Sequence, residues 1–222
     1  MTVFEFIAQC KSAYKLRRDA KQLLAQIEKE GGFYRRQGKI YEQDLQVYLP
    51  AVAHLSGAIA EIGVRFGDTF QHLIPFAKQQ NKAIYAVDSF QGTKQNSVYD
   101  SRPDFNMSIG GVDVFLARMR SRGFLERDYN TLVGWIPEVF EQFPADVQFS
   151  FVILDVDNYT PTVDSLNFAW PRLQSGGLLF CDDFCTYHQV DAGRAIREFL
   201  RDRTDYWLER VLPNYQIVLR KN

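Results

Sequence analysis

The stretch A-E-I-G-V-R-F-G-D-T, residues 60–69, decides the fold of this chain. A short apolar run leads into it, and two glycines, Gly63 and Gly67, follow in G-x-x-x-G spacing. Glycines at the end of a strand let the backbone approach a ligand closely, at the edge where open α/β sheets bind their ligands. The spacing differs from the G-x-G-x-x-G of a dinucleotide site. The segment is therefore either a ligand-binding turn or a purely structural turn from a strand into a helix.

Around and beyond this stretch, short β-rich runs alternate with helical segments. The runs comprise residues 58–62, 83–87, 131–133, 149–154 and 178–181. Such alternation predicts a parallel sheet with helices on both faces. Two further runs, 206–212 and 215–220, are separated by Pro213 and Asn214, which are too few for a parallel crossover and predict an antiparallel hairpin. The expected fold is α/β, a single Rossmann-like sheet that is mostly parallel and ends in an antiparallel C-terminal hairpin.

The residues before this sheet are expected to be helical. Residues 3–30 are rich in good helix formers, and two glycines end that segment. Residues 41–54 are a second helical stretch, which Pro50 interrupts. We predict an N-terminal helical extension, residues 1–57, followed by one domain, residues 58–222. The helices of the extension are the surface through which we expect a homo-oligomer to form.

The composition is that of an ordinary globular protein. With 26 basic and 27 acidic residues and a net charge of -1, the overall charge does not predict nucleic-acid binding. The longest apolar runs have the length of a strand, so we expect neither a membrane span nor a cleavable leader. The three cysteines, Cys10, Cys181 and Cys185, do not predict a disulfide framework, and a reducing cytoplasm is the expected location.

An acidic residue ends the second strand, in the sequence Y-A-V-D-S-F-Q-G at residues 85–92. Asp88, with Ser89 beside it, is placed to accept hydrogen bonds from the hydroxyls of a ribose. Phe90 can then lie against an adenine face. The alternative is that Asp88 and Ser89 only cap the segment that follows.

Two apolar strands end abruptly in carboxylates. Asp155 and Asp157 follow the first of them, and Asp182 and Asp183 follow the second. If these strands are parallel neighbours, their C-terminal ends lie about 5 Å apart, so Asp155, Asp182 and Asp183 converge. Such crowded carboxylates raise one another's pKa unless a cation neutralises them, and oxygen ligands favour Mg²⁺ or Ca²⁺ over zinc. The alternative is that these residues only cap helices at two loops.

Two more residues and one loop are candidates for the site. His188, five residues after Asp183, is either a catalytic base or a solvated loop histidine. Trp135, after the third strand, either borders an adenine or belongs to the core. Residues 93–110, which we term the acceptor loop, are polar, lack a clear period and end in glycine. These properties predict a lid that is mobile without ligand.

The order of these motifs resembles that of the macrocin O-methyltransferase (TylF-type) family, class I enzymes that methylate sugar hydroxyls of natural-product glycosides. The shared pattern is, in chain order, E-x-G-V-x-x-G, D-S-F-x-G, G-W, D-x-D-x-Y, P-x-L-x-x-G-G and D-D-F. It extends from about Ala58 to Phe199, most of the predicted sheet domain. The resemblance implies a class I methyltransferase sheet.

The resemblance also implies S-adenosylmethionine and Mg²⁺ as cofactors. By resemblance, Glu61, Gly63 and Asp88 bind S-adenosylmethionine, while Asp155, Asp182 and Asp183 hold Mg²⁺. The residue patterns above add four candidate cofactor-binding residues, Gly67, Ser89, Phe90 and Trp135. The implied acceptor is a hydroxyl of a sugar or of a glycosylated small molecule.

Methyl transfer to such a hydroxyl requires an aligned and activated oxygen. A metal held by aspartates can bind two vicinal oxygens and lower the pKa of one of them. Asp155, Asp157 or His188 would take the proton, and the sequence does not choose among them. Two alternatives remain open. One is an enzyme that methylates a catechol-like diol by the same metal chemistry, and the other is a non-catalytic nucleotide-binding or protein-interaction module of the same fold.

Overall fold

The computed structural model describes residues 37–184, 190–212 and 216–222. Its sheet contains the strands β1 (Ala58–Ile62), β2 (Ile84–Asp88), β3 (Asn130–Val133), β4 (Phe149–Leu154), β5 (Leu173–Cys181), β6 (Tyr206–Val211) and β7 (Ile217–Lys221). The described α-helices are α2 (Gln37–Ala51), α3 (Phe70–Gln79), α4 (Val112–Ser121), α5 (Tyr159–Arg172) and α6 (Val190–Leu200). Two short 3-10 helices, η2 (Glu126–Asp128) and η3 (Glu138–Gln142), flank β3.

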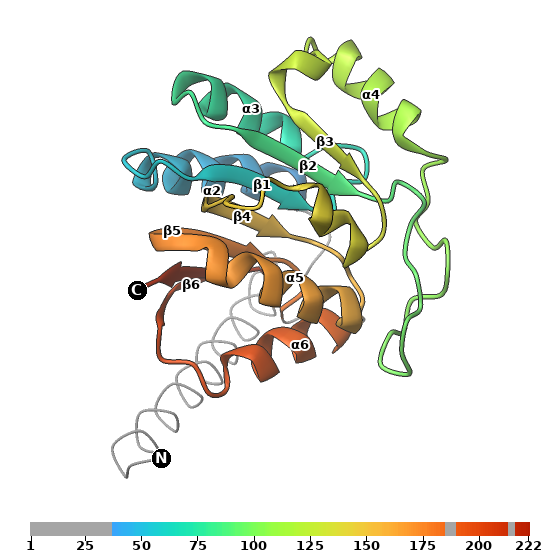
Figure 1. The fold of residues 1–222 in the computed structure, drawn as a ribbon, viewed down its shortest axis with the longest axis vertical. Coiled ribbons are helices and arrows are strands. Elements are labelled where there is room, and N and C mark those ends of the chain that lie inside the picture. The colour runs from blue at the N-terminus through green and yellow to red at the C-terminus, as the bar shows by residue number, and fades with distance from the viewer. Residues whose placement is uncertain (1–36, 185–189, 213–215) are drawn as a thin grey trace.

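The sheet is wound outward from its centre in both directions (Figure 1). Its strand order is β3-β2-β1-β4-β5-β7-β6, and the neighbours from β3 to β5 pair in parallel. β7 pairs antiparallel with both β5 and β6. The predicted α/β fold, with a mostly parallel sheet and an antiparallel C-terminal hairpin, is therefore confirmed. The winding changes direction between β1 and β4, and open α/β sheets bind their ligands at such a switch point.

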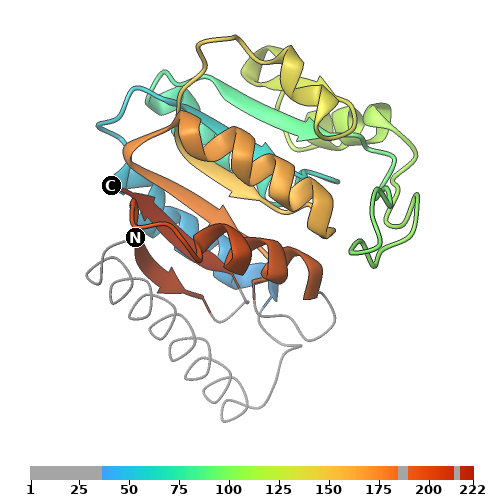
Figure 2. The ribbon, with the colours of Figure 1, turned by 60° about the horizontal axis from the view of Figure 1, so that its bottom comes forward.

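Helices cover both faces of the sheet, with α5 and α6 side by side on one of them (Figure 2). Alternate residues of a strand point to opposite faces. On β4, Val152 and Leu154 therefore pack in the core under α5 and α6, whereas Phe151 and Ile153 pack in the core under α2, α3 and α4. The buried residues of α3 recur at helical spacing: Phe70, Leu73, Ile74 and Ala77.

The helix α2 is part of the core of the sheet domain. Leu45 and Leu49 of α2 are buried in the same core as α3. This helix corresponds to the predicted stretch 41–54, and Pro50 lies in its last turn. Residues 1–36 lie outside the described residues, so the predicted domain boundary at residue 57 stays a prediction. Among the described helices, none has both the length and the apolar character that crossing a bilayer requires.

Candidate functional site

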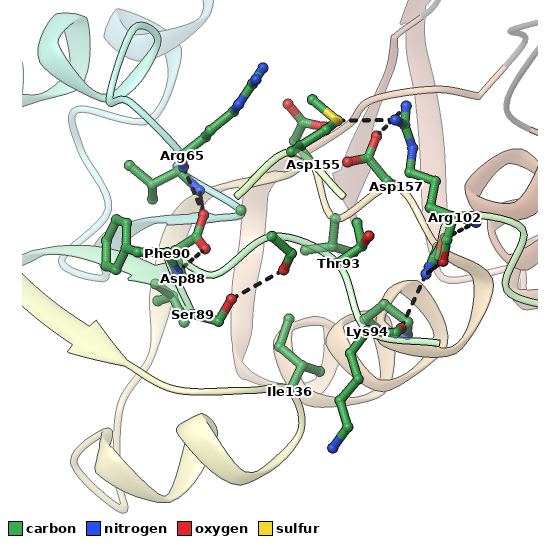
Figure 3. A pocket seen from close by; sticks show the side chains of 18 of the residues that line it. Arg65, Asp88, Ser89, Phe90, Thr93, Lys94, Arg102, Ile136, Asp155 and Asp157 are labelled. Atoms are coloured by element: carbon green, nitrogen blue, oxygen red, sulfur yellow. Dashed lines mark hydrogen bonds and ion pairs between the residues drawn. The ribbon is translucent and has the colours of Figure 1, made fainter. Parts of the chain in front are cut away.

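The carboxyl ends of β1, β2, β4 and β5 meet at one edge of the sheet, and a cavity of about 410 Å³ opens there (Figure 3). The register brings the ends together, because Ile62 pairs with Val87 of β2 and Leu154 of β4. Leu154 in turn pairs with Cys181 of β5. The residues that follow these positions line the cavity, namely Gly63, Asp88, Asp155 and Asp182.

The two glycines of the first motif serve the packing of the fold itself. Gly63 has a φ of +90°, and a Cβ at this position would lie 1.7 Å from the carbonyl oxygen of Asp155. Gly67 has a φ of +74°, and a Cβ there would lie 2.8 Å from Sδ of Met119 on α4. Gly63 lines the cavity, but Gly67 does not. The structural explanation therefore accounts for both glycines, and this geometry does not support a cofactor contact for Gly67.

Asp88 uses its carboxylate to hold the glycine turn. Its Oδ2 accepts hydrogen bonds from the backbone N–H of Val64 at 2.8 Å and of Arg65 at 2.7 Å. Its Oδ1 accepts one from the N–H of Phe90 at 2.7 Å. Burial raises the pKa of Asp88, and these backbone donors lower it. These donors use most of the acceptor positions of the carboxylate, so the contact of Asp88 with a ribose hydroxyl stays a prediction.

Glu61 reaches the same cavity from β1 and is only 3% exposed. Burial raises the pKa of Glu61 well above its ordinary value, and the nearby charge of Asp88 raises it further. Among the described residues, Oε2 of Glu61 has no hydrogen-bond partner. An unpartnered buried carboxylate is unfavourable, so this atom suits a cationic or hydrogen-bond-donating group of a ligand.

The side chains of Ser89 and Phe90 are engaged within the protein. Ser89 Oγ accepts a hydrogen bond from the N–H of Gln91 and donates one to the carbonyl of Gly92, which forms a local turn. Phe90 is 1% exposed and stacks on Phe115, with the ring centroids 4.9 Å apart. A buried ring in this packing presents little surface to an adenine. Phe90 also lines the cavity, so its contact with an adenine stays a prediction.

Trp135 forms a half-buried wall of the cavity. The ammonium of Lys94 lies 5.8 Å from its ring centroid, and the ring of Phe105 lies 6.4 Å away in an edge-on arrangement. Both neighbours come from the acceptor loop. Trp135 therefore belongs to the cavity rather than to the core alone, and its contact with an adenine stays a prediction.

Four carboxylates gather where β4 and β5 end. One oxygen from each of Asp155, Asp157 and Asp183 lies within 4.8 Å of the others. After burial, the charge of Asp182 has the largest effect on the pKa of both Asp155 and Asp183. The predicted ligands Asp155, Asp182 and Asp183 are thus neighbours. The structure adds Asp157, which the sequence indicates as a candidate base, to the same cluster.

Burial and mutual repulsion oppose full ionisation of this cluster. Burial raises the pKa of Asp155 well above its ordinary value, and the charges of Asp182 and Asp157 raise it further. Burial and the charge of Asp182 raise the pKa of Asp183 to about 8. With a pKa of about 8, Asp183 holds a proton near neutral pH unless a cation replaces that proton. A set of carboxylate oxygens is the donor set that Mg²⁺ or Ca²⁺ prefers.

A basic residue that the sequence pattern did not indicate, Arg102, reaches the cluster from the acceptor loop. Its Nη2 lies 2.9 Å from Oδ1 of Asp157. Burial raises the pKa of Asp157, and the guanidinium of Arg102 lowers it. Arg102 precedes a proline in a segment without periodicity, so no local signal in the sequence could identify its role.

Hydrogen bonds connect the middle of the acceptor loop to two helices, and its mobility without ligand stays a prediction. Asp100 is 1% exposed and accepts hydrogen bonds from the N–H of Ser97 in the loop and of Thr160 in α5. Asp191 of α6 accepts a hydrogen bond from the N–H of Ser101 at 2.6 Å. These buried acceptors fix the first half of the loop to two helices.

We expect hydrogen exchange in the ligand-free protein to divide the acceptor loop into two classes of amide. The amides of Ser97, Ser101 and Arg102 donate to protein acceptors and should exchange on the order of 100-fold more slowly than those of the exposed Val98 and Asp104. Exchange resolved by NMR measures this ratio. Uniformly fast exchange of all these amides would support the prediction of a mobile lid.

Two expectations concern residues that the structure does not describe. His188 lies in the undescribed segment 185–189, so its assignment as a base stays a prediction. The same holds for oligomerisation through the N-terminal helices, most of which fall within residues 1–36.

Two curated enzymes are similar in sequence to this chain. One is the mycinamicin III 3''-O-methyltransferase of Micromonospora griseorubida, 30% identical over 135 residues, which cover 56% of this chain and 51% of that enzyme. The other is the 8-demethyl-8-(2,3-dimethoxy-alpha-L-rhamnosyl)-tetracenomycin-C 4'-O-methyltransferase of Streptomyces olivaceus, 27% identical over 121 residues, which cover 51% of this chain and 44% of that enzyme. The chain thus spans about half the length of the curated relatives it matches.

A solved structure and a family model cover the same domain. The crystal structure of a calicheamicin methyltransferase superposes with a TM-score of 0.68 at 19% identity, covering 99% of this chain and 93% of that one, which establishes likeness of fold. A family model described as a methyltransferase domain matches residues 60–184, more than half of the chain, from the glycine turn to the double aspartate. The chain therefore belongs to this methyltransferase-domain family.

Proposed function

We propose that this protein is an S-adenosylmethionine-dependent, Mg²⁺-dependent O-methyltransferase that acts on a hydroxyl of a sugar or of a glycosylated small molecule. One observation carries the proposal. The cavity at the sheet edge holds the carboxylates of Glu61 and Asp88, suited to a cofactor, together with the four-aspartate cluster, suited to a metal. The proposal includes the macrocin O-methyltransferase type that the motif order implies. Both curated relatives are named as O-methyltransferases, and the name of the second includes a rhamnosyl group, which agrees with a sugar acceptor.

Glu61 and Asp88 fit S-adenosylmethionine at this site. Bound there, the cofactor supplies a methyl group on a sulfonium, which an oxygen nucleophile can displace. Asp88 lines the cavity with its carboxylate, which suits a hydrogen bond from a ribose hydroxyl. Glu61 has a buried oxygen without a partner, which suits a cationic group such as the ammonium of the cofactor. Gly63 and Trp135 complete the cofactor side of the cavity.

The aspartate cluster fits a divalent cation. We assign Asp155, Asp182 and Asp183 as its ligands, because all three line the cavity and, after burial, the charge of Asp182 has the largest effect on the pKa of the other two. A cation bound there supplies charge that orients two vicinal oxygens and lowers the pKa of one of them. The guanidinium of Arg102 favours the ionised form of Asp157, the form that can accept a proton, so we assign Asp157 as the base that takes the proton of the acceptor hydroxyl.

Two other functions use the same site. A catechol-like diol presents vicinal oxygens to a metal as a sugar does, so a panel with both kinds of acceptor separates these substrates. A non-catalytic module would bind the nucleoside cofactor without transferring its methyl group. The crowded carboxylates argue against such a module, because a binding role alone does not require neighbouring buried charges.

We expect Asp88→Asn to weaken the binding of S-adenosylhomocysteine by about 1.5–3 kcal/mol, because hydrogen bonds from ribose hydroxyls to a charged acceptor are lost. Isothermal titration calorimetry measures this change. The asparagine keeps the shape of the side chain and one acceptor oxygen for the glycine turn, so the variant should remain folded.

Asp128→Asn is the matched control for this experiment. Asp128 also accepts a backbone hydrogen bond, from Leu125 at 2.9 Å, but it lies outside the cavity. Its substitution should leave the affinity for S-adenosylhomocysteine unchanged. Equal affinity of the folded Asp88→Asn variant and the wild-type protein would remove Asp88 from the cofactor site.

A further inference from the structure

At the junction between β4 and α5, a residue from outside the helix takes the capping role of the N-cap residue. Asn158 is the N-cap residue of α5, yet its side chain makes no capping hydrogen bond. An N-cap asparagine ordinarily accepts a hydrogen bond from an N–H of the first helical turn. Here Oδ1 of Asp100, from the acceptor loop, accepts the N–H of Thr160 at 2.7 Å instead. The loop therefore caps the helix, and the cap residue is left to bind the loop.

The side chain of Asn158 forms hydrogen bonds with the acceptor loop on both sides of Asp100. Its Oδ1 accepts the N–H of Arg102 at 3.0 Å. Its Nδ2 donates to the carbonyl oxygens of Lys94 and Arg102, each at 3.1 Å. Asn158 is 0% exposed, so these bonds do not compete with water. Together with Asp100, they fix the backbone of Arg102 relative to the end of β4.

The fixed backbone carries the guanidinium of Arg102 to Asp157, the residue directly before Asn158. Asp157 has a φ of +62°, a left-handed conformation in which few residues other than glycine are found. Arg102 meets its Oδ1 at 2.9 Å and also donates Nη1 to Sδ of Met107 at 3.0 Å. The pair is mostly shielded, with Arg102 23% and Asp157 16% exposed, so solvent screens it only in part.

We infer that Arg102 is a positioning residue for methyl transfer, which holds the carboxylate of Asp157 in one orientation at the cavity, and that Asn158 holds Arg102 in place. The inference rests on the proposed function, in which Asp157 accepts the proton of the acceptor. A carboxylate at the end of a strand can turn about its side-chain bonds, and a fixed ion pair removes that freedom. Arg102 itself does not take part in the transfer of the methyl group or of the proton.

Steady-state kinetics test this role with Arg102→Ala, Arg102→Lys and Arg120→Ala. The probe acceptors are methyl glycosides that carry vicinal hydroxyls, with S-adenosylmethionine and Mg²⁺ present. Arg102→Ala should lower kcat about 10- to 100-fold, as the loss of an orienting partner commonly does, with KM for S-adenosylmethionine within about twofold of wild type. Added guanidinium ion should restore part of kcat, and Arg102→Lys should retain more of it than Arg102→Ala. Arg120 forms an exposed ion pair with Glu126, so Arg120→Ala should behave as wild type.

A second measurement needs no acceptor. Crystal structures of the wild-type protein and of Arg102→Ala, both with S-adenosylhomocysteine and Mg²⁺, should show Asp157 in different side-chain rotamers. Asn158→Ala should displace Arg102 and accelerate hydrogen exchange at its amide. An unchanged Asp157 rotamer in Arg102→Ala, or a kcat equal to that of wild type, would overturn the inference. Failure of the wild-type protein to bind S-adenosylhomocysteine would instead count against the proposed function, while crystal structures of the two proteins without ligand would still show whether Arg102 holds the carboxylate of Asp157.

Discussion

Mg²⁺ should stabilise the wild-type protein by about 2.7 kcal/mol at a concentration one hundred times its dissociation constant, and Asp155→Asn should abolish this stabilisation together with turnover. Burial raises the pKa of Asp155, and the charges of Asp182, Asp157 and Asp183 raise it further, so Asp155 interacts with every other member of the cluster. A cation that binds these groups only in the folded state must increase the free energy of unfolding. Thermal unfolding at several Mg²⁺ concentrations measures the effect.

The control for this experiment is Asp146→Asn, which removes an exposed carboxylate outside the cavity. This variant should keep the full response to Mg²⁺. Turnover should stop on exhaustive chelation and return when Mg²⁺ is added back. Full turnover of a glycoside acceptor in the chelated protein would contradict the proposed metal role.

The dependence of protein stability on pH provides a second test of the metal site. The pKa of Asp183 is raised from 3.8 to about 8 in the folded protein. Between these values the folded state keeps a proton that the unfolded state has released. The metal-free protein should therefore lose stability as the pH rises from about 4 to about 8. Asp183→Asn should flatten this slope, and saturating Mg²⁺ should do the same in the wild-type protein because the cation takes the place of the proton.

The variants Asp182→Asn and Asp157→Asn distinguish ligand from base. Asp182→Asn should reduce the Mg²⁺ stabilisation and the turnover together, whereas Asp157→Asn should keep much of the stabilisation and lose turnover. The converse result would make Asp157 the third ligand, in line with its oxygen lying within 4.8 Å of those of Asp155 and Asp183.

Gly63→Ala should destabilise the protein by about 3–5 kcal/mol, since it combines backbone strain with a direct steric clash. The φ of Gly63 is +90°, and the added Cβ would lie 1.7 Å from the carbonyl oxygen of Asp155. Relief of the clash requires β1 and β4 to move apart at the edge that carries the site. Urea unfolding measures the change in the free energy of unfolding. If the loss exceeds the stability of the wild-type protein, the variant will be unfolded even without urea.

Gly176→Ala is the matched control for the clash. Gly176 also has a positive φ, +82°, but nothing lies within 4 Å of its added Cβ. Gly176→Ala adds backbone strain but no steric clash, so we expect the free energy of unfolding to fall by about 1–2 kcal/mol. Equal effects of the two substitutions would mean that the strand ends can relax around Gly63.

The local pattern of the sequence determined the parallel sheet, the terminal hairpin and the chemistry at the strand ends. Alternating β-rich and helical runs reflect which residues become buried on each element, and that property depends on neighbours a few positions away. The placement of Asp155 and Asp182 directly after apolar strands is equally local. Because parallel strands end at one edge, the sequence was sufficient to predict that these carboxylates lie close together.

The tertiary structure alone decided which side chains are open to a ligand and which are used by the fold. Gly67 lies against Met119 and Phe115 of α4, and the ring of Phe90 stacks on Phe115, which their motif positions did not indicate. The cap of α5 joins Asp100 to Thr160, 60 positions apart in the chain. No local pattern encodes such a contact, because its energy depends on the packing of distant segments. The same packing brings Arg102 to Asp157 and attaches the acceptor loop to Asn158, and the sequence indicated neither contact.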